Sequence, residues 1–210
     1  MTTVGVTGGI GSGKSAFVAR LGEHAGARVL LADDLAKRLM ADDPDVRGQL
    51  VARFGPETFD DAGALDRGRL AARVFGDPGE LAALNAIVHP AVRRALEDEQ
   101  ARARADGVEV LVYEAALLFE TGGDAVVDLV VVVDAPVDVR VARAAARDGV
   151  SQAAVRDRLR HQIDPATARA RADRVVDNAG DLAALQAAAD ALAHDLGLDA
   201  RRSLPGPLGG

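Results

Sequence analysis

The chain has 210 residues, of which 49% are hydrophobic but only 3% aromatic, so it is long enough for one α/β domain with a core of Ala, Val and Leu. Its 25 basic and 32 acidic side chains give a net charge of −7, which argues against a general nucleic-acid binder. The absence of cysteine excludes disulfides, thiolate metal sites and cysteine nucleophiles.

The apolar segments are short. The longest run, from Leu129 to Val133, cannot cross a bilayer, and the apolar stretch near the N-terminus is interrupted by glycines and follows no basic residues. We therefore expect a soluble, cytoplasmic protein with no membrane or nucleic-acid partner. We expect it to act on a small molecule as a monomer or weak homo-oligomer.

In chain order, strand-like runs alternate with helical patterns, which predicts an α/β fold with a parallel five-stranded sheet. Strands are expected near 3–7, 28–31, 108–113, 128–133 and 174–177. Helices are expected over 14–24, 34–41, 43–54, 67–76, 79–106, 137–148, 151–161 and 181–196. Pro90 lies inside the longest helical stretch and should end or kink it near His89.

The first loop carries the strongest motif. Residues Gly8 to Ser15 fit the pattern G-x-x-x-x-G-K-[ST], between a predicted strand and a predicted helix, which is the context of a phosphate-binding loop. Backbone N–H groups would cradle the phosphates of ATP, Lys14 would reach the β- and γ-phosphates, and the Ser15 hydroxyl would bind Mg²⁺. The alternative is a glycine turn that only joins a strand to a helix.

Two gaps between predicted strands are too long for simple crossovers. They predict helical inserts over roughly 35–106 and 137–172, the second of them rich in arginine. A phosphate-loop core with one insert for the acceptor and one as a lid is the layout of a small kinase. The stretch 199–210 holds prolines and glycines and is predicted to be a disordered tail.

Acidic side chains follow two of the predicted strands. Asp33 follows the second strand, where it could accept the proton of an acceptor hydroxyl, or could instead cap the next helix. Glu114 follows the third strand, where it could order Mg²⁺ together with Ser15, whereas Glu120 could also be an ordinary solvated glutamate.

Two further features suggest nucleotide contacts. Arg140, Arg143 and Arg147 fall on one face of a predicted helix, where they could grip phosphates or form a solvated face balanced by acids. Asn178 follows the last strand and could read the adenine edge, although Asp-Asn-x-Gly is also common turn chemistry. Among the histidines only His89 has an unusual setting, before Pro90, and His24, His161 and His194 are expected at the surface.

Taken together, these features resemble the dephospho-CoA kinase family, over about residues 2–190. The likeness rests on the order and spacing of Val6 to Ser15, Ala32-Asp33, Leu65-Asp66-Arg67, Leu84-Asn85, His89-Pro90, Leu117-Leu118-Phe119-Glu120, Arg143, Arg147, Gln162, Ala172-Asp173 and Asp177-Asn178. The resemblance implies a P-loop NTPase-type three-layer fold. It also implies transfer of the ATP γ-phosphoryl group to the 3′-hydroxyl of the ribose of dephospho-CoA, the last step of coenzyme A synthesis.

The resemblance also implies roles for individual residues. Catalysis would involve Asp33, Lys14 and Arg143. ATP would be bound by Gly8, Gly9, Ile10, Gly11, Ser12, Gly13, Lys14, Ser15, Ala16, Arg143, Arg147 and Asn178, and Mg²⁺ by Ser15 and Glu114. The substrate would contact Asp33, Lys37, His89, Leu118 and Glu120. One domain, 1–198, would consist of a core (1–34, 107–136, 173–198), a CoA-binding helical insert (35–106) and a lid (137–172).

Several positions depart from the pattern common in that family. Leu31 and Lys37 stand where an Asp and an Arg are frequent, and Arg140 stands where a Gln is expected. Glu114, Ala116 and Ala16 replace an Asp, a Pro and a Thr, respectively. Two other interpretations are another small-molecule kinase of nucleoside or nucleotide type, and a non-catalytic nucleotide switch.

Overall fold

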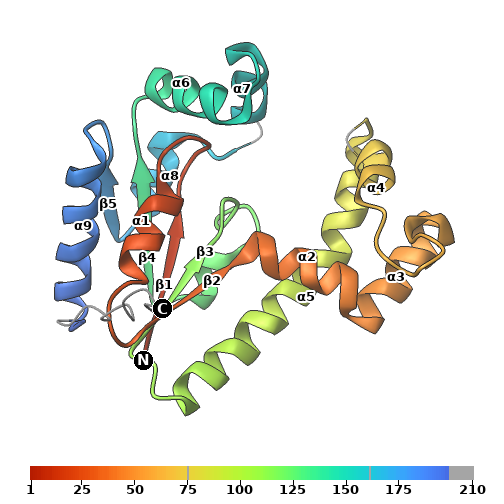
Figure 1. Cartoon of the computed structure of the whole chain (residues 1–210), viewed down its shortest axis with the longest axis horizontal. Coiled ribbons are helices and arrows are strands. Elements are labelled where there is room, and N and C mark those ends of the chain that lie inside the picture. The colour runs from red at the N-terminus through yellow and green to blue at the C-terminus, as the bar shows by residue number, and fades with distance from the viewer. Residues whose placement is uncertain (75, 161, 199–210) are drawn as a thin grey trace, which may run out of the picture. The chain divides into compact units, whose positions relative to one another are not determined.

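The computed structural model describes residues 1–74, 76–160 and 162–198, which form two compact units (Figure 1). The first unit contains residues 1–30 and the described residues from Gln100 onward, and the second contains Leu31–Glu99. Among the described residues, no helix is both long and apolar enough to cross a membrane.

The first unit is built around a sheet of five strands in the order β2-β3-β1-β4-β5. The strands are β1 (Thr2–Thr7), β2 (Ala27–Leu31), β3 (Val110–Glu114), β4 (Leu129–Asp134) and β5 (Arg174–Asp177). The central strand β1 pairs in parallel with β3 and with β4, and β4 pairs in parallel with β5. The predicted α/β fold with a parallel five-stranded sheet is confirmed.

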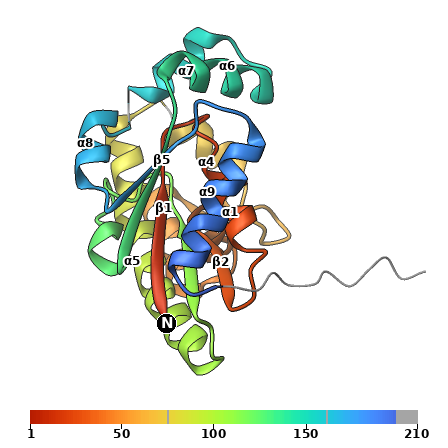
Figure 2. The same cartoon turned by 90° about the vertical axis from the view of Figure 1, so that its left-hand side faces the viewer.

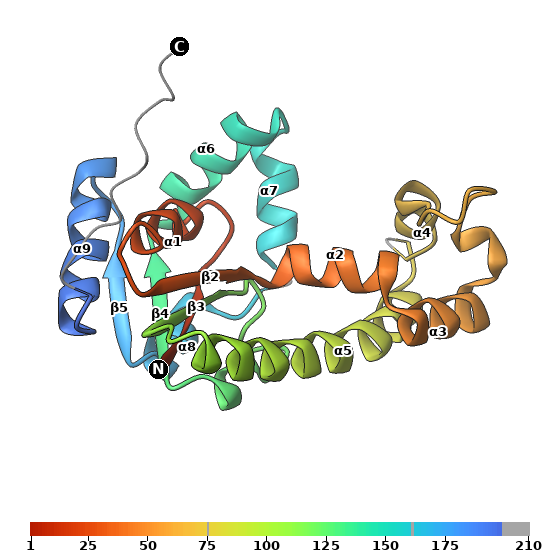
Figure 3. The same cartoon turned by 60° about the horizontal axis from the view of Figure 1, so that its bottom comes forward.

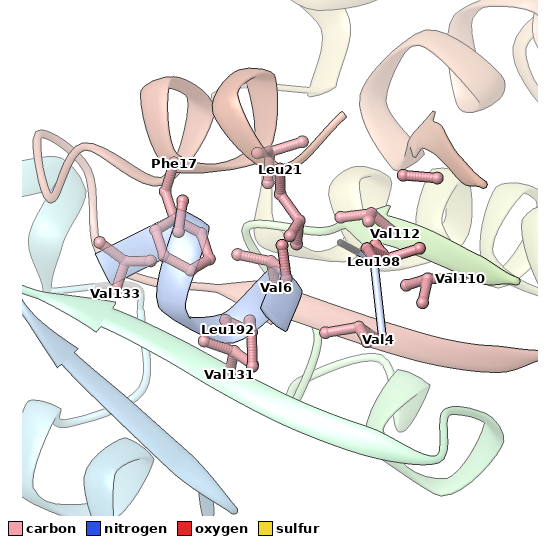
Figure 4. Packing of buried hydrophobic residues seen from close by; sticks show 14 of the residues in the cluster. Val4, Val6, Phe17, Leu21, Val110, Val112, Val131, Val133, Leu192 and Leu198 are labelled. Carbon is pink, nitrogen blue, oxygen red and sulfur yellow. The ribbon is translucent and has the colours of Figure 1, made fainter. Parts of the chain in front are cut away.

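Helices cover both faces of this sheet. Figure 2 shows α1 (Lys14–Leu21) and α9 (Leu182–Asp195) on one side and α8 (Pro165–Arg171) on the other. In the core, Phe17 and Leu21 of α1 pack with valines of the central strands, such as Val6 and Val133 (Figure 4). Because both faces are covered, β1 and β4 are buried along almost their whole length, and this core anchors the loop between β1 and α1.

Between β4 and β5 the chain forms a helical excursion. It begins with the paired helices α6 (Val137–Asp148) and α7 (Gln152–Leu159) and ends with α8 (Figure 3). Helix α8 is not among the helices predicted from the sequence. Asp164 caps it by accepting a hydrogen bond from the Thr167 N–H, and Pro165 occupies its first turn. A 3-10 turn, η2 (Gly123–Val126), was also not anticipated.

The second unit is helical. It contains α2 (Ala32–Asp42), α3 (Pro44–Phe54), the 3-10 turn η1 (Pro56–Thr58), α4 (Arg67–Val74) and most of α5 (Pro78–Ala105). Its own core includes Val46, Leu50, Phe54 and Leu70. Helix α5 continues through Pro90, so the predicted end near His89 is wrong, whereas the predicted kink stays a prediction.

Two other expectations need correction. Helix α2 already begins at Ala32, so Asp33 lies in its first turn and does not cap it; Leu31 takes the cap position without a side-chain hydrogen bond. His24 is buried, because its ring nitrogens contact the Leu198 carbonyl and the Asp190 carboxylate. His194 is exposed, as expected. The expectations for His161 and for the tail 199–210 lie outside the described residues.

Candidate active site

The glycine loop from Gly8 to Gly13 joins β1 to α1 and presents backbone donors. Gly13 is the N-cap of α1, with φ 96° and no side-chain cap. The N–H groups of Gly9, Gly11 and Gly13 have no hydrogen-bond acceptor among the described residues. Unpaired amides at the start of a helix, where its dipole is positive, form an anion-binding site. The loop can therefore bind phosphate groups.

A cation, a hydroxyl and a carboxylate meet next to this loop. Oε1 of Glu114, at the end of β3, lies 4.0 Å from Nζ of Lys14 and accepts a 3.3 Å hydrogen bond from Oγ of Ser15. The side chains of Lys14 and Glu114 are 14% and 15% exposed. Hydroxyl and carboxylate oxygens are ligands suited to Mg²⁺, which usually completes its coordination with water and substrate phosphates. Ser15 and Glu114 therefore fit a magnesium site.

Two side chains from distant segments hold the backbone of the loop. Nδ2 of Asn178, which follows β5, donates a buried 2.7 Å hydrogen bond to the Ser12 carbonyl. Oε1 of Gln162, between α7 and α8, accepts a 3.0 Å hydrogen bond from the Ile10 N–H. The sequence predicts that Asn178 reads adenine, whereas Gln162 is marked only as one of the residues that carry the family resemblance, with no predicted contact. The adenine contact of Asn178 stays a prediction.

The first turn of α6 packs directly on the loop. A Cβ atom at Gly9 would overlap Nη1 of Arg140, and a Cβ at Gly11 would overlap the Arg140 backbone carbonyl. Gly11 also has φ +78°, a conformation that residues with a side chain rarely adopt. The closeness of α6 therefore requires glycine at Gly11, whereas a side chain at Gly9 would have to displace the tip of Arg140. Arg140 itself is only 4% exposed.

The other two arginines of α6 are bound elsewhere. Arg143 donates hydrogen bonds to the carbonyls of Asn178 (3.0 Å) and Gly180 (3.1 Å). Arg147 is exposed and pairs with Asp148, whose carboxylate raises the pKa of the guanidinium. Their predicted phosphate contacts stay predictions. Arg140, the buried one of the three, stands at the position where the family resemblance leads us to expect glutamine.

In the second unit, Asp33 and Lys37 form an ion pair on one face of α2. Nζ of Lys37 lies 2.8 Å from Oδ2 of Asp33 and 3.1 Å from Oδ1 of Asp34. The carboxylate of Asp33, followed by that of Asp34, raises the pKa of the lysine. The Asp33 side chain is 88% exposed, so a ligand can reach it.

Four other predicted residues have different surroundings. His89, on α5, is half-buried, and burial lowers the pKa of its imidazole. Leu118 is fully buried and packs against Gly5 and Gly123, so in this structure it offers no surface for the predicted substrate contact. The exposed Glu120 carboxylate accepts a 2.8 Å hydrogen bond from the Ile163 N–H, between α7 and α8. The Ala16 N–H donates to the Gly13 carbonyl.

Comparison with known proteins agrees with this arrangement. A profile of the family described as dephospho-CoA kinase matches residues 2–184. A dephospho-CoA kinase of Salinibacter ruber is 50% identical over 182 residues, which are 87% of this chain and 91% of that protein. A dephospho-CoA kinase of Anaeromyxobacter dehalogenans is 44% identical over 205 residues, 98% of this chain and 97% of that one.

Solved structures show the same fold. The crystal structure of TT1252 from Thermus thermophilus superposes with a TM-score of 0.76 at 39% identity and covers 93% of this chain and 97% of its own. The dephospho-CoA kinase from Campylobacter jejuni gives 0.69 at 23% identity, with 92% and 96% covered. Since the family profile and these relatives span most of the chain, the protein belongs to the dephospho-CoA kinase family.

Proposed function

We propose that this protein transfers the γ-phosphoryl group of ATP to the 3′-hydroxyl of the ribose of dephospho-CoA, giving coenzyme A and ADP. One observation carries the proposal: a glycine loop with unpaired amides lies next to Lys14, Ser15 and Glu114 in a chain of the dephospho-CoA kinase family. The reaction would complete the synthesis of coenzyme A.

On the nucleotide side, the loop amides would bind the phosphates and Lys14 would place its positive charge on the β- and γ-phosphates. Ser15 and Glu114 would hold Mg²⁺, which when bound neutralises charge on the phosphate oxygens. Because the Glu114 carboxylate already accepts a hydrogen bond from Ser15, it would keep the hydroxyl oriented and its lone pairs directed at the metal site.

On the acceptor side, we propose that Asp33 accepts the proton of the ribose hydroxyl and orients its oxygen for in-line attack. Its exposed carboxylate supports this role, because an acceptor hydroxyl can reach it beside the ammonium of Lys37, which lies 2.8 Å away. Lys37, His89 and Glu120 remain proposed contacts of the substrate, as do Arg143 and Arg147 of the phosphates. The protein would work in the cytoplasm as a monomer or weak homo-oligomer.

The test is to incubate the purified protein with Mg-ATP and, separately, dephospho-CoA, adenosine, AMP or no acceptor, and to detect products by mass spectrometry. Coenzyme A formed from dephospho-CoA alone is the expected result. Turnover of adenosine or AMP would instead indicate a nucleoside or nucleotide kinase, and ATP hydrolysis without acceptor preference would indicate a nucleotide switch.

A paired variant links the activity to the loop. Lys14→Met should lower kcat/KM by at least about a hundredfold, because electrostatic groups on a transferring phosphoryl group are worth several kcal/mol. Arg94→Met removes an exposed positive charge from α5 and is the matched control, expected to act like the unmutated protein. Equal activity of the two variants would contradict the assignment of Lys14.

A further inference from the structure

Arg140 is a buried cation without a partner among the residues that the structure describes. The residue is 4% exposed, and its Nε has no hydrogen-bond acceptor there. Within the part of the chain that the structure describes, no carboxylate or carbonyl pairs with its guanidinium. Leaving a charged group buried and unpaired is costly. An anion that the described residues do not supply would stabilise a group in this state.

The guanidinium borders a pocket at the start of the glycine loop. The end of β1 and the loop contribute Thr7, Gly8 and Gly9, and Asp134 and Gln162 also line the pocket. The Gly9 N–H has no acceptor within the described residues. Oε1 of Gln162 accepts the hydrogen bond from the Ile10 N–H, whereas Nε2 of Gln162 donates none to a described residue. Hydrogen-bond donors from three segments therefore surround the pocket.

The carboxylate that lines the pocket is already occupied. Oδ2 of Asp134 accepts a 3.1 Å hydrogen bond from Nη1 of Arg169, and Oδ1 accepts one of 2.9 Å from the Ala135 N–H. The charge of Asp134 is only partly offset by Arg169, which also donates a 2.6 Å hydrogen bond to Asp177. No carboxylate of the described residues pairs with the Arg140 guanidinium, so its N–H groups stay available to an anion.

We propose that this pocket binds a phosphoryl oxyanion, with Arg140 as its cationic ligand and Gly9 and Gln162 as further donors. The planar guanidinium, with its fork of N–H donors, matches the oxygens of a phosphate. The oxyanion is either the terminal phosphoryl group of a bound triphosphate or free inorganic phosphate. The inference rests on the proposed function only in the first case, because inorganic phosphate can be tested without any reaction.

The first experiment compares ATP with ADP by isothermal titration calorimetry in the absence of acceptor. Arg140→Gln removes the charge but keeps a polar side chain, and Arg140→Lys restores the charge without the fork. If the terminal phosphoryl group binds here, Arg140→Gln should weaken ATP at least about tenfold more than ADP, the size of one charge-assisted hydrogen bond, and Arg140→Lys should recover part of the loss. Arg156→Gln, an exposed lid arginine paired with Asp138, is the control.

The second experiment adds inorganic phosphate without nucleotide and follows thermal unfolding. If the pocket binds free phosphate, the unmutated protein should be stabilised by phosphate relative to chloride at equal ionic strength, and Arg140→Gln should not. Either positive result supports the oxyanion site and identifies its source. Equal weakening of ATP and ADP together with no phosphate effect would overturn the proposal and leave Arg140 a packing residue.

A crystal of the unmutated protein with a non-hydrolysable ATP analogue keeps the proposal testable even if the variants do not fold. We expect a phosphate oxygen within about 3 Å of the guanidinium. The proposal would also be overturned if the analogue bound on the loop without a phosphate oxygen near Arg140, and if a second crystal soaked in phosphate showed no anion there. Neither binding nor crystallography depends on coenzyme A being made, so failure of the proposed function would be recognised separately by the product assay.

Discussion

Nζ of Lys37 lies 2.8 Å from Oδ2 of Asp33, four residues earlier on α2. The same ammonium also lies 3.1 Å from Oδ1 of Asp34, so one lysine holds two consecutive carboxylates. The two acids nevertheless have different expected roles, because only Asp33 occupies the position of the aspartate that the family resemblance assigns to catalysis. This pair of neighbours offers a direct comparison by mutation.

Asp33→Asn should lower kcat by at least about a hundredfold, because it removes the proposed general base while keeping the shape of the side chain. Asp34→Asn is the matched control: it removes the neighbouring carboxylate, 58% exposed, from the same lysine and should retain most of the activity. Steady-state kinetics with dephospho-CoA would measure both. A near-normal rate for Asp33→Asn would refute the catalytic role.

Glu114→Gln should increase the Mg²⁺ concentration needed for half-maximal activity by about ten- to a hundredfold, the usual cost of losing a group that orients a metal ligand. The cause would be the loss of the negative charge next to Ser15. Glu109→Gln, exposed just before the other end of β3, is the control. An unchanged Mg²⁺ titration for Glu114→Gln would argue against a magnesium site at this position.

Asn178→Ala should lower the free energy of unfolding by about 1–3 kcal/mol, because it leaves the Ser12 carbonyl without its buried donor. Urea denaturation would measure this loss. The same variant tests the adenine contact: if Asn178 also reads the base, the preference for ATP over GTP should shrink. If it only holds the loop, both nucleotides should weaken equally. Unaltered stability would contradict the role of the hydrogen bond to Ser12.

His89 should make the fold sensitive to mild acid. Burial lowers the pKa of its imidazole from the ordinary 6.5, so the folded chain favours the neutral form. Below pH 6.5 the unfolded chain takes up a proton that the folded chain resists, and the free energy of unfolding therefore falls as the pH decreases. Denaturation curves between pH 7.5 and 5 should show a smaller decrease for His89→Gln. Parallel pH profiles would show that His89 does not contribute.

The sequence was most informative where local chemistry decides the structure. The pattern from Gly8 to Ser15 predicted the loop and its helix, and the continuous valines of β4 predicted a strand covered on both faces. The short helix α8 was missed because its apolar pattern is weak, although Asp164 and Pro165 are recognisable start signals. Asp33 was considered as a cap only because the start of α2 was expected two residues too late.

Side-chain partners were harder to predict than elements. Asn178 and Gln162 are more than a hundred residues from the loop in the chain, and nothing in their local sequence indicates that they bind its backbone. The helical pattern placed Arg140, Arg143 and Arg147 on one face, but it could not say which of them the neighbouring loop would bury. Such contacts depend on how α6 leaves β4, which only tertiary packing determines.

The close approach of α6 to Gly9 and Gly11 also limits how this enzyme can be redesigned. A chimera that combined this α6 with a loop bearing a side chain at Gly11 would force that side chain and the Arg140 backbone into the same space. Exchanging α6 between relatives would therefore require the loop and the first turn of α6 to be transplanted as one piece.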